Sequence, residues 1–298
     1  MVLNKLIDSL TENIEKPKTR QDIDLILDGG AFRGSYTMGA LYFLKRLESK
    51  YWIKIHRISG CSIGSIAGLV YISDKLDLAE NFYIGARNHF IKHFNLGHTK
   101  KWLYDFNKKF LKKNDYEKFN DRLFITYWDV TNCRQIVKSK FKNNDDLIET
   151  VIRSCFVPYV FNGKMLWKNR YVDGFYPYIF PKESNRKLMA ICIMKSNHLF
   201  DICCIKNEIN NLGRIYEGIL ETYLFFKKKP SKYCCYFEDW SVSETLFFYF
   251  RIFLAYYMII CYYTMNRFFP KVLLCNDKCF LKDIAIFFYK SFITNFCI

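Results

Sequence analysis

Two apolar segments, each followed at once by glycine and then by a helical pattern, most strongly limit the folds open to this chain. Residues 24–30 (DLILDGG) join a strand pattern to a tight turn, and apolar side chains at helical spacing follow over residues 38–47. Residues 53–60 (IKIHRISG) lead in the same way into a helix of small residues over 63–71. Strand, turn and helix repeated in this order are typical of parallel strands covered by helices. We therefore expect an α/β fold with a mostly parallel central sheet flanked by helices.

After these two units the sequence predicts more alternating strands and helices, and then a change in composition. We expect strands over 123–127, 135–137 and 188–194, and helices over 1–20, 147–153 and parts of the aromatic, basic stretch 80–120. After Pro230 the chain becomes strongly apolar and aromatic. We therefore divide it into an N-terminal helix (1–20), an α/β domain (21–205) and a helical, apolar C-terminal extension (206–298).

The chain carries a formal net charge of +16, from 45 lysines and arginines against 29 aspartates and glutamates. Such an excess attracts anionic surfaces over long range, and membrane phosphates and nucleic acid both fit it. No nucleic-acid-binding motif accompanies the charge, so we expect no nucleic acid partner. Aromatic side chains lie between several basic clusters, which favours an anionic membrane surface. The sequence gives no oligomeric state.

Twelve cysteines do not by themselves indicate disulfides in this chain. Residues 1–16 contain no uninterrupted apolar segment and no small-residue cleavage site, so we expect an intracellular protein with reduced cysteines. No C-x-x-C motif lies near a second one, and His89 and His93, four residues apart, lack a metal-binding partner motif. We therefore expect no metal site and assign these two histidines a surface or lid-helix role.

Residues 246–263 (LFFYFRIFLAYYMIICYY) form a long apolar run in which Arg251 is the only charged residue. A spanning helix needs about 20 predominantly apolar residues, and an arginine held at the bilayer centre costs roughly 2.5–3.5 kcal/mol. Three interpretations stay open: an ordinary buried helix, an anchor that lies on the membrane, and a transmembrane span. In the last two, the protein is peripheral or anchored to a membrane inside the cell.

The pattern Gly60-Cys61-Ser62-Ile63-Gly64 lies between a predicted strand and a predicted helix. In such an elbow the serine occupies a strained turn, and a Cβ atom at either glycine would collide with the neighbouring strand or helix. The pattern alone is weak, but its position between strand and helix is the required one. It predicts that Ser62 is a nucleophile.

A second motif, residues 28–34 (DGGAFRG), lies at the earlier strand-to-helix turn. Consecutive backbone N–H groups at a helix N-terminus stabilise negative charge, either of a phosphate or of the oxyanion of a tetrahedral intermediate. The chain has neither G-x-G-x-x-G nor the Lys-Ser/Thr ending of a P-loop at this turn. With a serine elbow about thirty residues later, an oxyanion hole is the better interpretation.

A third motif, Asp173-Gly174, lies within residues 169–181 (NRYVDGFYPYIFP). An Asp-Gly pair by itself more often marks a simple turn. Here it indicates a functional site, because two other motifs precede it in the chain.

These three motifs, in this order, resemble the patatin-like phospholipases, whose pattern is D-G-G-G-x-R/K-G, then G-x-S-x-G, then D-G-G/A. Residues 153–158 (RSCFVP) also resemble the segment that precedes the last motif in that family. The resemblance spans about residues 22–200 and implies a three-layer α/β/α catalytic domain over 21–205. It also implies a lipid acyl hydrolase of phospholipase A type, which cleaves fatty-acyl esters through an acyl-enzyme intermediate and needs no cofactor.

The resemblance implies a role for each matching residue. Ser62 would attack the ester carbonyl, and Asp173 would act directly as its general base, without a histidine. The oxyanion hole would be formed by Gly29, Gly30, Ala31, Arg33 and Gly34, and the elbow glycines would be Gly60 and Gly64. An exposed carboxylate is a weak base for a hydroxyl proton, so we expect burial to raise the pKa of Asp173.

Two positions depart from the family pattern: Ala31 replaces its third glycine, and Phe175 follows Asp173-Gly174. The Ala31 methyl costs about 1 kcal/mol if that position requires a positive φ. These departures keep open a catalytically silent lipid-binding protein. An α/β-hydrolase esterase with a Ser/Asp/His triad is a further alternative. Such an enzyme needs a histidine after its acid in the chain, and His198 is the only histidine after Asp173.

Overall fold

The computed structural model places the two expected strand–turn–helix units side by side in one sheet. Strand β1 (Gln21–Leu27) pairs in parallel with β2 (Ile53–Gly60), and the last residues of the two strands are register partners. Helices α2 (Gly34–Ser49) and α3 (Ile63–Ile72) follow these strands. Both turns therefore leave the sheet at the same edge, which brings the first two glycine motifs together.

The structure describes residues 2–183, 185–194, 204–206 and 208–268, together with Ser291 and Thr294. The sheet has the order β4-β3-β2-β1-β6-β7, and β5 pairs with β3. Its remaining strands are β3 (Leu123–Asp129), β4 (Arg134–Lys138), β5 (Tyr171–Val172), β6 (Lys187–Ile191) and β7 (Cys234–Tyr236). The four central strands are parallel, whereas β4, β5 and β7 pair antiparallel with β3 or β6. The predicted α/β fold with a mostly parallel sheet is confirmed. The antiparallel strands at the edges of the sheet were not predicted.

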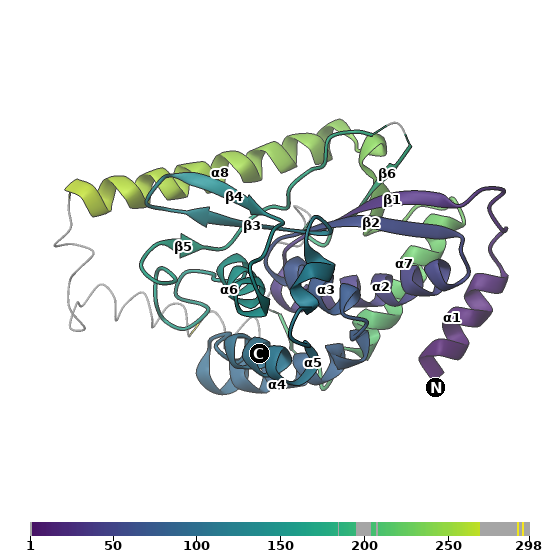
Figure 1. Cartoon of the computed structure of the whole chain (residues 1–298), viewed down its shortest axis with the longest axis horizontal. Helices are drawn as coiled ribbons and strands as arrows, with labels where there is room; N and C mark the ends of the chain where they lie inside the picture. Colours follow the sequence, from purple (N-terminus) through teal and green to yellow (C-terminus); the bar gives the residue numbers. More distant parts are fainter. Residues whose placement is uncertain are drawn as a thin grey trace.

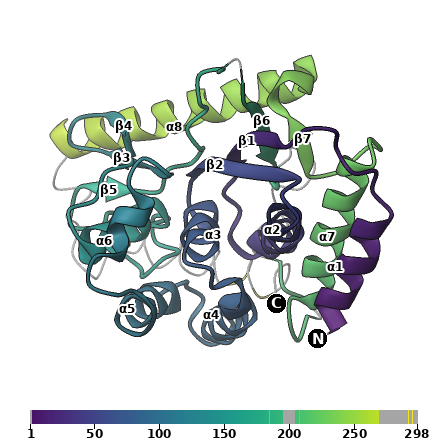
Figure 2. The same cartoon turned by 45° about the vertical axis from the view of Figure 1, so that its right-hand side comes forward.

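Most helices lie on one face of this sheet (Figure 2). Helices α2, α3 and α6 lie directly below it, α4 and α5 lie farther out, and α1 and α7 flank α2. The expected helices over 1–20, 80–120 and 147–153 are present as α1, α4, α5 and α6. The bounds are α1 (Val2–Glu12), α4 (Ala79–His93), α5 (His98–Phe110), α6 (Asn144–Ser154), α7 (Leu212–Phe226) and α8 (Val242–Phe268), with 3-10 helices η1 (Ala31–Arg33), η2 (Leu76–Leu78), η3 (Asp115–Phe119) and η5 (Phe237–Asp239).

Helix α7 and strand β7 fall within the segment 206–298, yet both pack directly on the α/β unit. Strand β7 pairs with β6, and α7 crosses α2 where Gly39 faces Gly218. A Cβ atom at Gly39 would lie 2.1 Å from the carbonyl oxygen of Ile215, and one at Gly218 would lie 2.1 Å from that of Tyr36. The two backbones therefore touch only because both positions are glycine.

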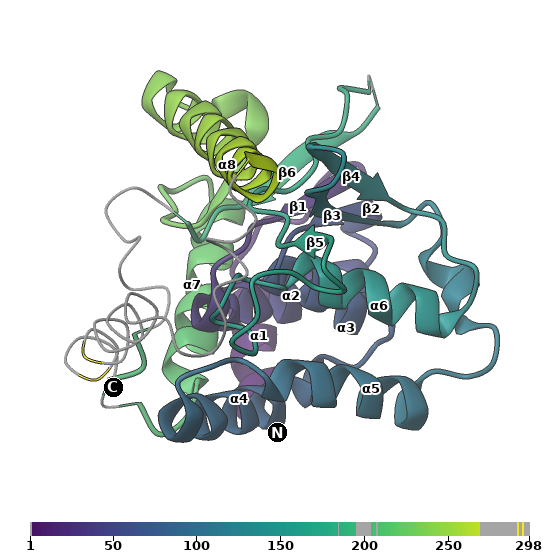
Figure 3. The same ribbon diagram turned by 90° about the vertical axis from the view of Figure 1, so that its left-hand side faces the viewer.

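Helix α8 lies across the opposite face of the sheet from α2 and α3 (Figures 1 and 3). The stretch Val242–Thr264 of this helix is 23 residues long, and an 18-residue window within it has a mean hydropathy of 1.6. By length and composition only, it could cross a membrane. Its inner side chains Phe248, Ala255 and Ile259 pack against Trp128 of β3 and its neighbours. Within that window, 17% is buried inside the protein.

Candidate active site

Ser62 lies in a strained turn between β2 and α3. Its backbone has φ 51° and ψ −127°, in a region that side-chain-bearing residues rarely adopt. A Cβ atom at Gly60 would lie 2.5 Å from the carbonyl oxygen of Gly64, and one at Gly64 would lie 2.4 Å from that of Leu27. The two elbow glycines are therefore required by the close packing of backbone around the serine, as the motif predicts.

The end of α6 joins the serine turn to the loop that carries Asp173. The backbone N–H of Ser62 donates to Oγ of Ser154 at 2.9 Å, and the carbonyl of Ser154 accepts from the N–H of Gly174 at 3.3 Å. Cys155 donates its thiol to the carbonyl of Ser62 at 3.2 Å. Ser154 was not predicted from the sequence as a site residue, although it lies within the segment 153–158 that resembles the family.

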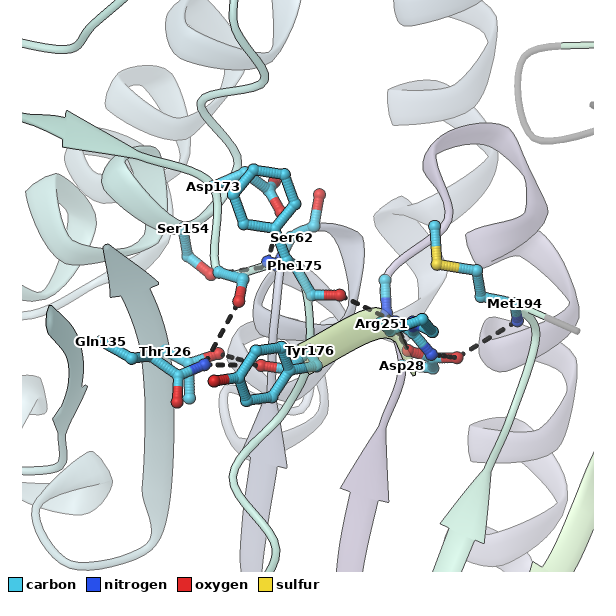
Figure 4. Close-up of polar contacts among 12 residues, drawn as sticks. Asp28, Ser62, Thr126, Gln135, Ser154, Asp173, Phe175, Tyr176, Met194 and Arg251 are labelled. Atoms are coloured by element: carbon cyan, nitrogen blue, oxygen red, sulfur yellow. Dashed lines mark hydrogen bonds and ion pairs between the residues drawn. The ribbon is translucent and has the colours of Figure 1, made fainter. Parts of the chain in front are cut away.

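Asp173 follows β5 and its side chain faces the same cavity as Ser62 (Figure 4). The residue is only 5% exposed, and Oδ1 accepts from the N–H of Phe175 at 2.8 Å. Oδ2 is buried and accepts no hydrogen bond from any described residue. Burial raises the pKa of Asp173 to about 6, while the N–H of Phe175, the Ser62 side chain and the charge of Arg251 act in the opposite direction.

The Asp173 loop is fixed to β3 and β4 by backbone contacts. A Cβ atom at Gly174 would lie 2.4 Å from the carbonyl oxygen of Thr126, so this position requires glycine. Thr126 Oγ1 donates to the carbonyl of Tyr176 at 2.8 Å, and Gln135 Nε2 donates to the carbonyls of Gly174 and Tyr176 at 3.2 Å each. These bonds hold the carboxylate of Asp173 at the edge of the sheet where Ser62 lies (Figure 4).

The first part of the glycine-rich turn lines the same cavity. Gly29, Gly30 and Ala31 all border it, together with Ser62. Gly30 has φ 150° and Ala31 has φ 41°, so the alanine occupies the left-handed region that favours glycine. The condition for a strain of about 1 kcal/mol at Ala31 is therefore met.

Arg33 and Gly34 lie away from the cavity lining. The guanidinium of Arg33 lies 5.5 Å from the ring centre of Tyr36 and 6.0 Å from that of Tyr233. A Cβ atom at Gly34 would lie 2.2 Å from Cγ1 of Ile63, so this glycine allows the two turns to pack closely. The five residues predicted for the oxyanion hole therefore divide into three that border the cavity and two that support the turn.

Phe175 also has a positive φ, at 58°, and its ring borders the cavity. Its carbonyl accepts from Nη2 of Arg251, and Arg251 also forms an ion pair with Asp28 (Figure 4). From the sequence we considered Arg251 only in relation to a membrane, and we did not predict its contact with Asp28. A single arginine in a long apolar run was the available signal of a buried acidic partner.

The cavity has a volume of about 270 Å³ and a largely apolar lining. The side chains that line it beyond Ser62 and Asp173 come mainly from α4 and from the loops before α5 and after α6, and include Phe82, Ala86, Leu96, Val157, Val160 and Phe161. Apolar cavities with a few converging polar groups are typical ligand sites. A cavity that is apolar apart from a serine hydroxyl and a carboxyl suits a ligand that joins an apolar chain to a polar group.

None of the four histidines within the described residues lines this cavity. His56 lies beside Asp22, with 3.4 Å between Nε2 and Oδ1. The rings of His89 and His93 lie 4.5 Å apart on α4, and the described part of the chain holds no group of three His, Cys, Asp or Glu side chains that could bind a metal. His198 lies outside the described residues.

The raised pKa of Asp173 predicts a specific dependence of stability on pH. A buried carboxyl whose pKa rises from 3.8 to about 6 on folding favours the folded state fully below 3.8, and this stabilisation is lost as pH rises from 3.8 through about 6. Two pKa units correspond to about 3 kcal/mol. In urea titrations we expect Asp173→Asn to become more stable relative to wild type, by up to about 3 kcal/mol, between about pH 4 and about pH 7.

Asp121→Asn is the matched control, because the Asp121 side chain is 62% exposed. Its stability should follow that of the wild type across the same pH range. If the stability of Asp173→Asn also follows that of the wild type at every pH, the carboxyl of Asp173 has an ordinary pKa and the described burial is wrong.

The chain is similar to a family model and to a mouse protein. The family model described as patatin-like phospholipase matches residues 25–176, a range that contains Ser62, Asp173 and the glycine-rich turn. The omega-hydroxyceramide transacylase of Mus musculus is 28% identical over an alignment of 160 residues, and the match covers 49% of this chain and 26% of that protein. The chain thus spans about a quarter of the length of this relative. Its fold, its three motifs and the family match show that the chain belongs to the patatin-like phospholipase family.

Proposed function

We propose that this lipid acyl hydrolase cleaves fatty-acyl esters of phospholipids through a dyad of Ser62 and Asp173. The observation that carries the proposal is the shared apolar cavity, which Ser62 enters from a strained turn and Asp173 enters with a buried, unpartnered oxygen. A carboxyl with a pKa of about 6 is largely ionised at neutral pH and is a stronger base than an exposed one. The apolar lining accommodates the acyl chain next to the nucleophile.

The reaction follows from these positions. Oδ2 of Asp173 takes the proton of the Ser62 hydroxyl while Oγ forms a bond to the ester carbonyl carbon. The backbone N–H groups of the turn 29–31 stabilise the oxyanion. The C–O bond of the ester then breaks, the leaving alcohol receives the proton from Asp173, and water repeats the sequence to release the fatty acid and free Ser62.

Acyl transfer to a hydroxyl other than water is the second candidate, because the mouse relative is named as a transacylase. It shares the acyl-enzyme intermediate with hydrolysis and differs only in the acceptor. Analysis of the products formed with and without an added lipid alcohol separates the two activities.

Substitutions at the two proposed catalytic residues test the dyad. We expect Ser62→Ala and Asp173→Asn each to lower kcat on a chromogenic acyl ester and on phospholipid vesicles by at least about 10³-fold, since each removes a group that acts in the transition state. The wild-type rate should rise with pH through about 6, where Asp173 ionises.

The chain offers a matched Ser/Asp pair as control. Ser139 Oγ donates to Oδ1 of Asp121 at 3.2 Å on the exposed surface, so Ser139→Ala and Asp121→Asn should keep wild-type rates. Loss of activity in His198→Ala would instead support a triad hydrolase. A folded wild type that is inert on every ester tested would support a silent lipid-binding protein.

We also propose that the outer face of α8 contacts a lipid surface. This face carries exposed apolar side chains: Leu246, Tyr249, Phe250, Phe253, Leu254 and Tyr257. Exposed apolar patches of this kind mark interaction sites, and aromatic rings favour the membrane interface. Because Arg251 is held in an ion pair inside the protein, a helix lying along the membrane fits this docked arrangement, whereas a span does not.

Removing the outer aromatic rings tests this contact. We expect the triple variant Tyr249→Ser, Phe253→Ser, Tyr257→Ser to lose at least about tenfold in the rate on phospholipid vesicles, because the buried interfacial area falls. The rate on a short soluble ester should stay at the wild-type level. Tyr51→Ser removes a ring that is 80% exposed elsewhere and should change neither rate. Equal vesicle sedimentation of the triple variant and wild type would contradict the proposal.

A further inference from the structure

Arg251 connects α8 to two different parts of the candidate active site. Its guanidinium forms two hydrogen bonds with the Asp28 carboxylate, at 2.8 Å to Oδ1 and 3.1 Å to Oδ2. Nη2 also donates to the carbonyl of Phe175 at 2.7 Å (Figure 4). The Arg251 side chain is 12% exposed and that of Asp28 is 5% exposed, so these contacts are made away from water.

Each partner of Arg251 is one hydrogen bond from a group that the proposed reaction uses. Asp28 Oδ1 accepts from the N–H of Gly29 at 3.0 Å, at the start of the oxyanion turn. Its Oδ2 accepts from the N–H of Met194 at 3.2 Å, after β6. On the other side, the N–H of Phe175 donates to Oδ1 of Asp173. The glycine turn and the base therefore meet at one guanidinium.

The two loops that Arg251 joins come from separate parts of the sheet. The glycine turn follows β1 in the centre of the sheet, whereas Asp173 follows β5, which pairs on β3 outside the main strand order. Both loops also contain residues with positive φ, at Ala31 and Phe175, which cost free energy and need support from neighbours. A planar arginine with several donors can bridge two such loops in a fixed geometry, which a point charge cannot.

We propose that Arg251 is a positioning residue that fixes the position of the glycine-rich turn, through Asp28, relative to the Asp173 loop, through the peptide of Phe175. The site is then fully formed only when α8 is docked. This rests on the function proposed above and extends it, since the helix with the lipid-facing side chains also completes the site. Arg251 itself does not line the cavity and acts through its two partners.

The charge of Arg251 gives a second consequence that simple loss of packing would not produce. The titratable or charged groups that face Asp173 are Ser62 on the elbow, Arg251 on α8 and the buried thiols of Cys61 and Cys155. Arg251 lowers the pKa of Asp173, so its removal raises that pKa and moves the acid limb of the rate profile to higher pH.

The test compares Arg251→Gln and Arg251→Lys in the full chain on a short soluble ester. We expect Arg251→Gln to lower kcat by about 10- to 100-fold with KM within about threefold, because a small misplacement of catalytic groups costs rate rather than binding. Its acid limb should lie at higher pH than that of the wild type. Arg251→Lys keeps the charge without the planar fork, so it should restore the acid limb and only part of kcat.

Arg170→Gln is the control, because Arg170 also forms a two-bond ion pair with a buried carboxylate, that of Asp129 at 3.0 and 2.7 Å, and does not line the cavity. Its side chain is more exposed than that of Arg251, at 44% against 12%. The variant should lose stability while keeping the wild-type kcat and acid limb. A folded Arg251→Gln with wild-type kcat and acid limb would overturn the proposal, as would an equal loss in Arg170→Gln. If Arg251→Gln does not fold, wild-type kcat in Arg251→Lys overturns it.

A thermodynamic measurement separates failure of this proposal from failure of the proposed function. The difference in urea stability between the wild type and Asp173→Asn, followed against pH, reports the pKa of Asp173 without any turnover. The same difference measured in the Arg251→Gln background reports that pKa without the guanidinium. If the wild type hydrolyses no ester, the proposed function fails. If Arg251→Gln leaves unchanged the pH midpoint at which this stability difference is lost, the positioning role is overturned, whether or not the wild type is active.

Discussion

The turns after β1 and β2 press against each other with almost no space between their backbones, and the candidate site depends on this contact. A Cβ atom at Gly64 would lie 2.4 Å from the carbonyl of Leu27, and one at Gly34 would lie 2.2 Å from the side chain of Ile63. The contact requires two neighbouring parallel strands that end in register, as β1 and β2 do. The sheet therefore places the glycine-rich turn after β1 next to the strained backbone of Ser62, and the glycines allow that approach.

Buried charge is the second constraint on the site. Asp28 and Asp173 both lie buried at the carboxyl edge of the sheet, where a charge costs free energy unless it is paired. Asp28 is compensated by the ion pair with Arg251, whereas Asp173 keeps one unpartnered oxygen and a raised pKa. The difference suits different tasks, because a fixed ion pair holds a loop and an unpaired carboxylate accepts a proton.

The local part of this arrangement could be predicted from the sequence, and the long-range part could not. The elbow at Ser62 and the turn at Gly29 follow from short patterns, since strand, glycine and helix signals lie within a few residues of each other. The contact of Arg251 with Asp28 joins residues 223 positions apart and has no such pattern. The packing of α7 on α2 through Gly39 and Gly218 could not be predicted either, because it also joins residues far apart in the sequence. The positive φ of Ala31 could be stated only as a condition, because φ depends on the whole turn.

The central claim is that Ser62 is the nucleophile and that Asp173 activates it. Labelling with a fluorophosphonate ester, which reacts covalently with activated serines, measures this directly by intact mass and peptide mapping. The account predicts one adduct on the wild type at Ser62, none on Ser62→Ala, and at least about 10²-fold slower labelling of folded Asp173→Asn. Labelling at another residue, or equal rates for wild type and Asp173→Asn, would contradict it.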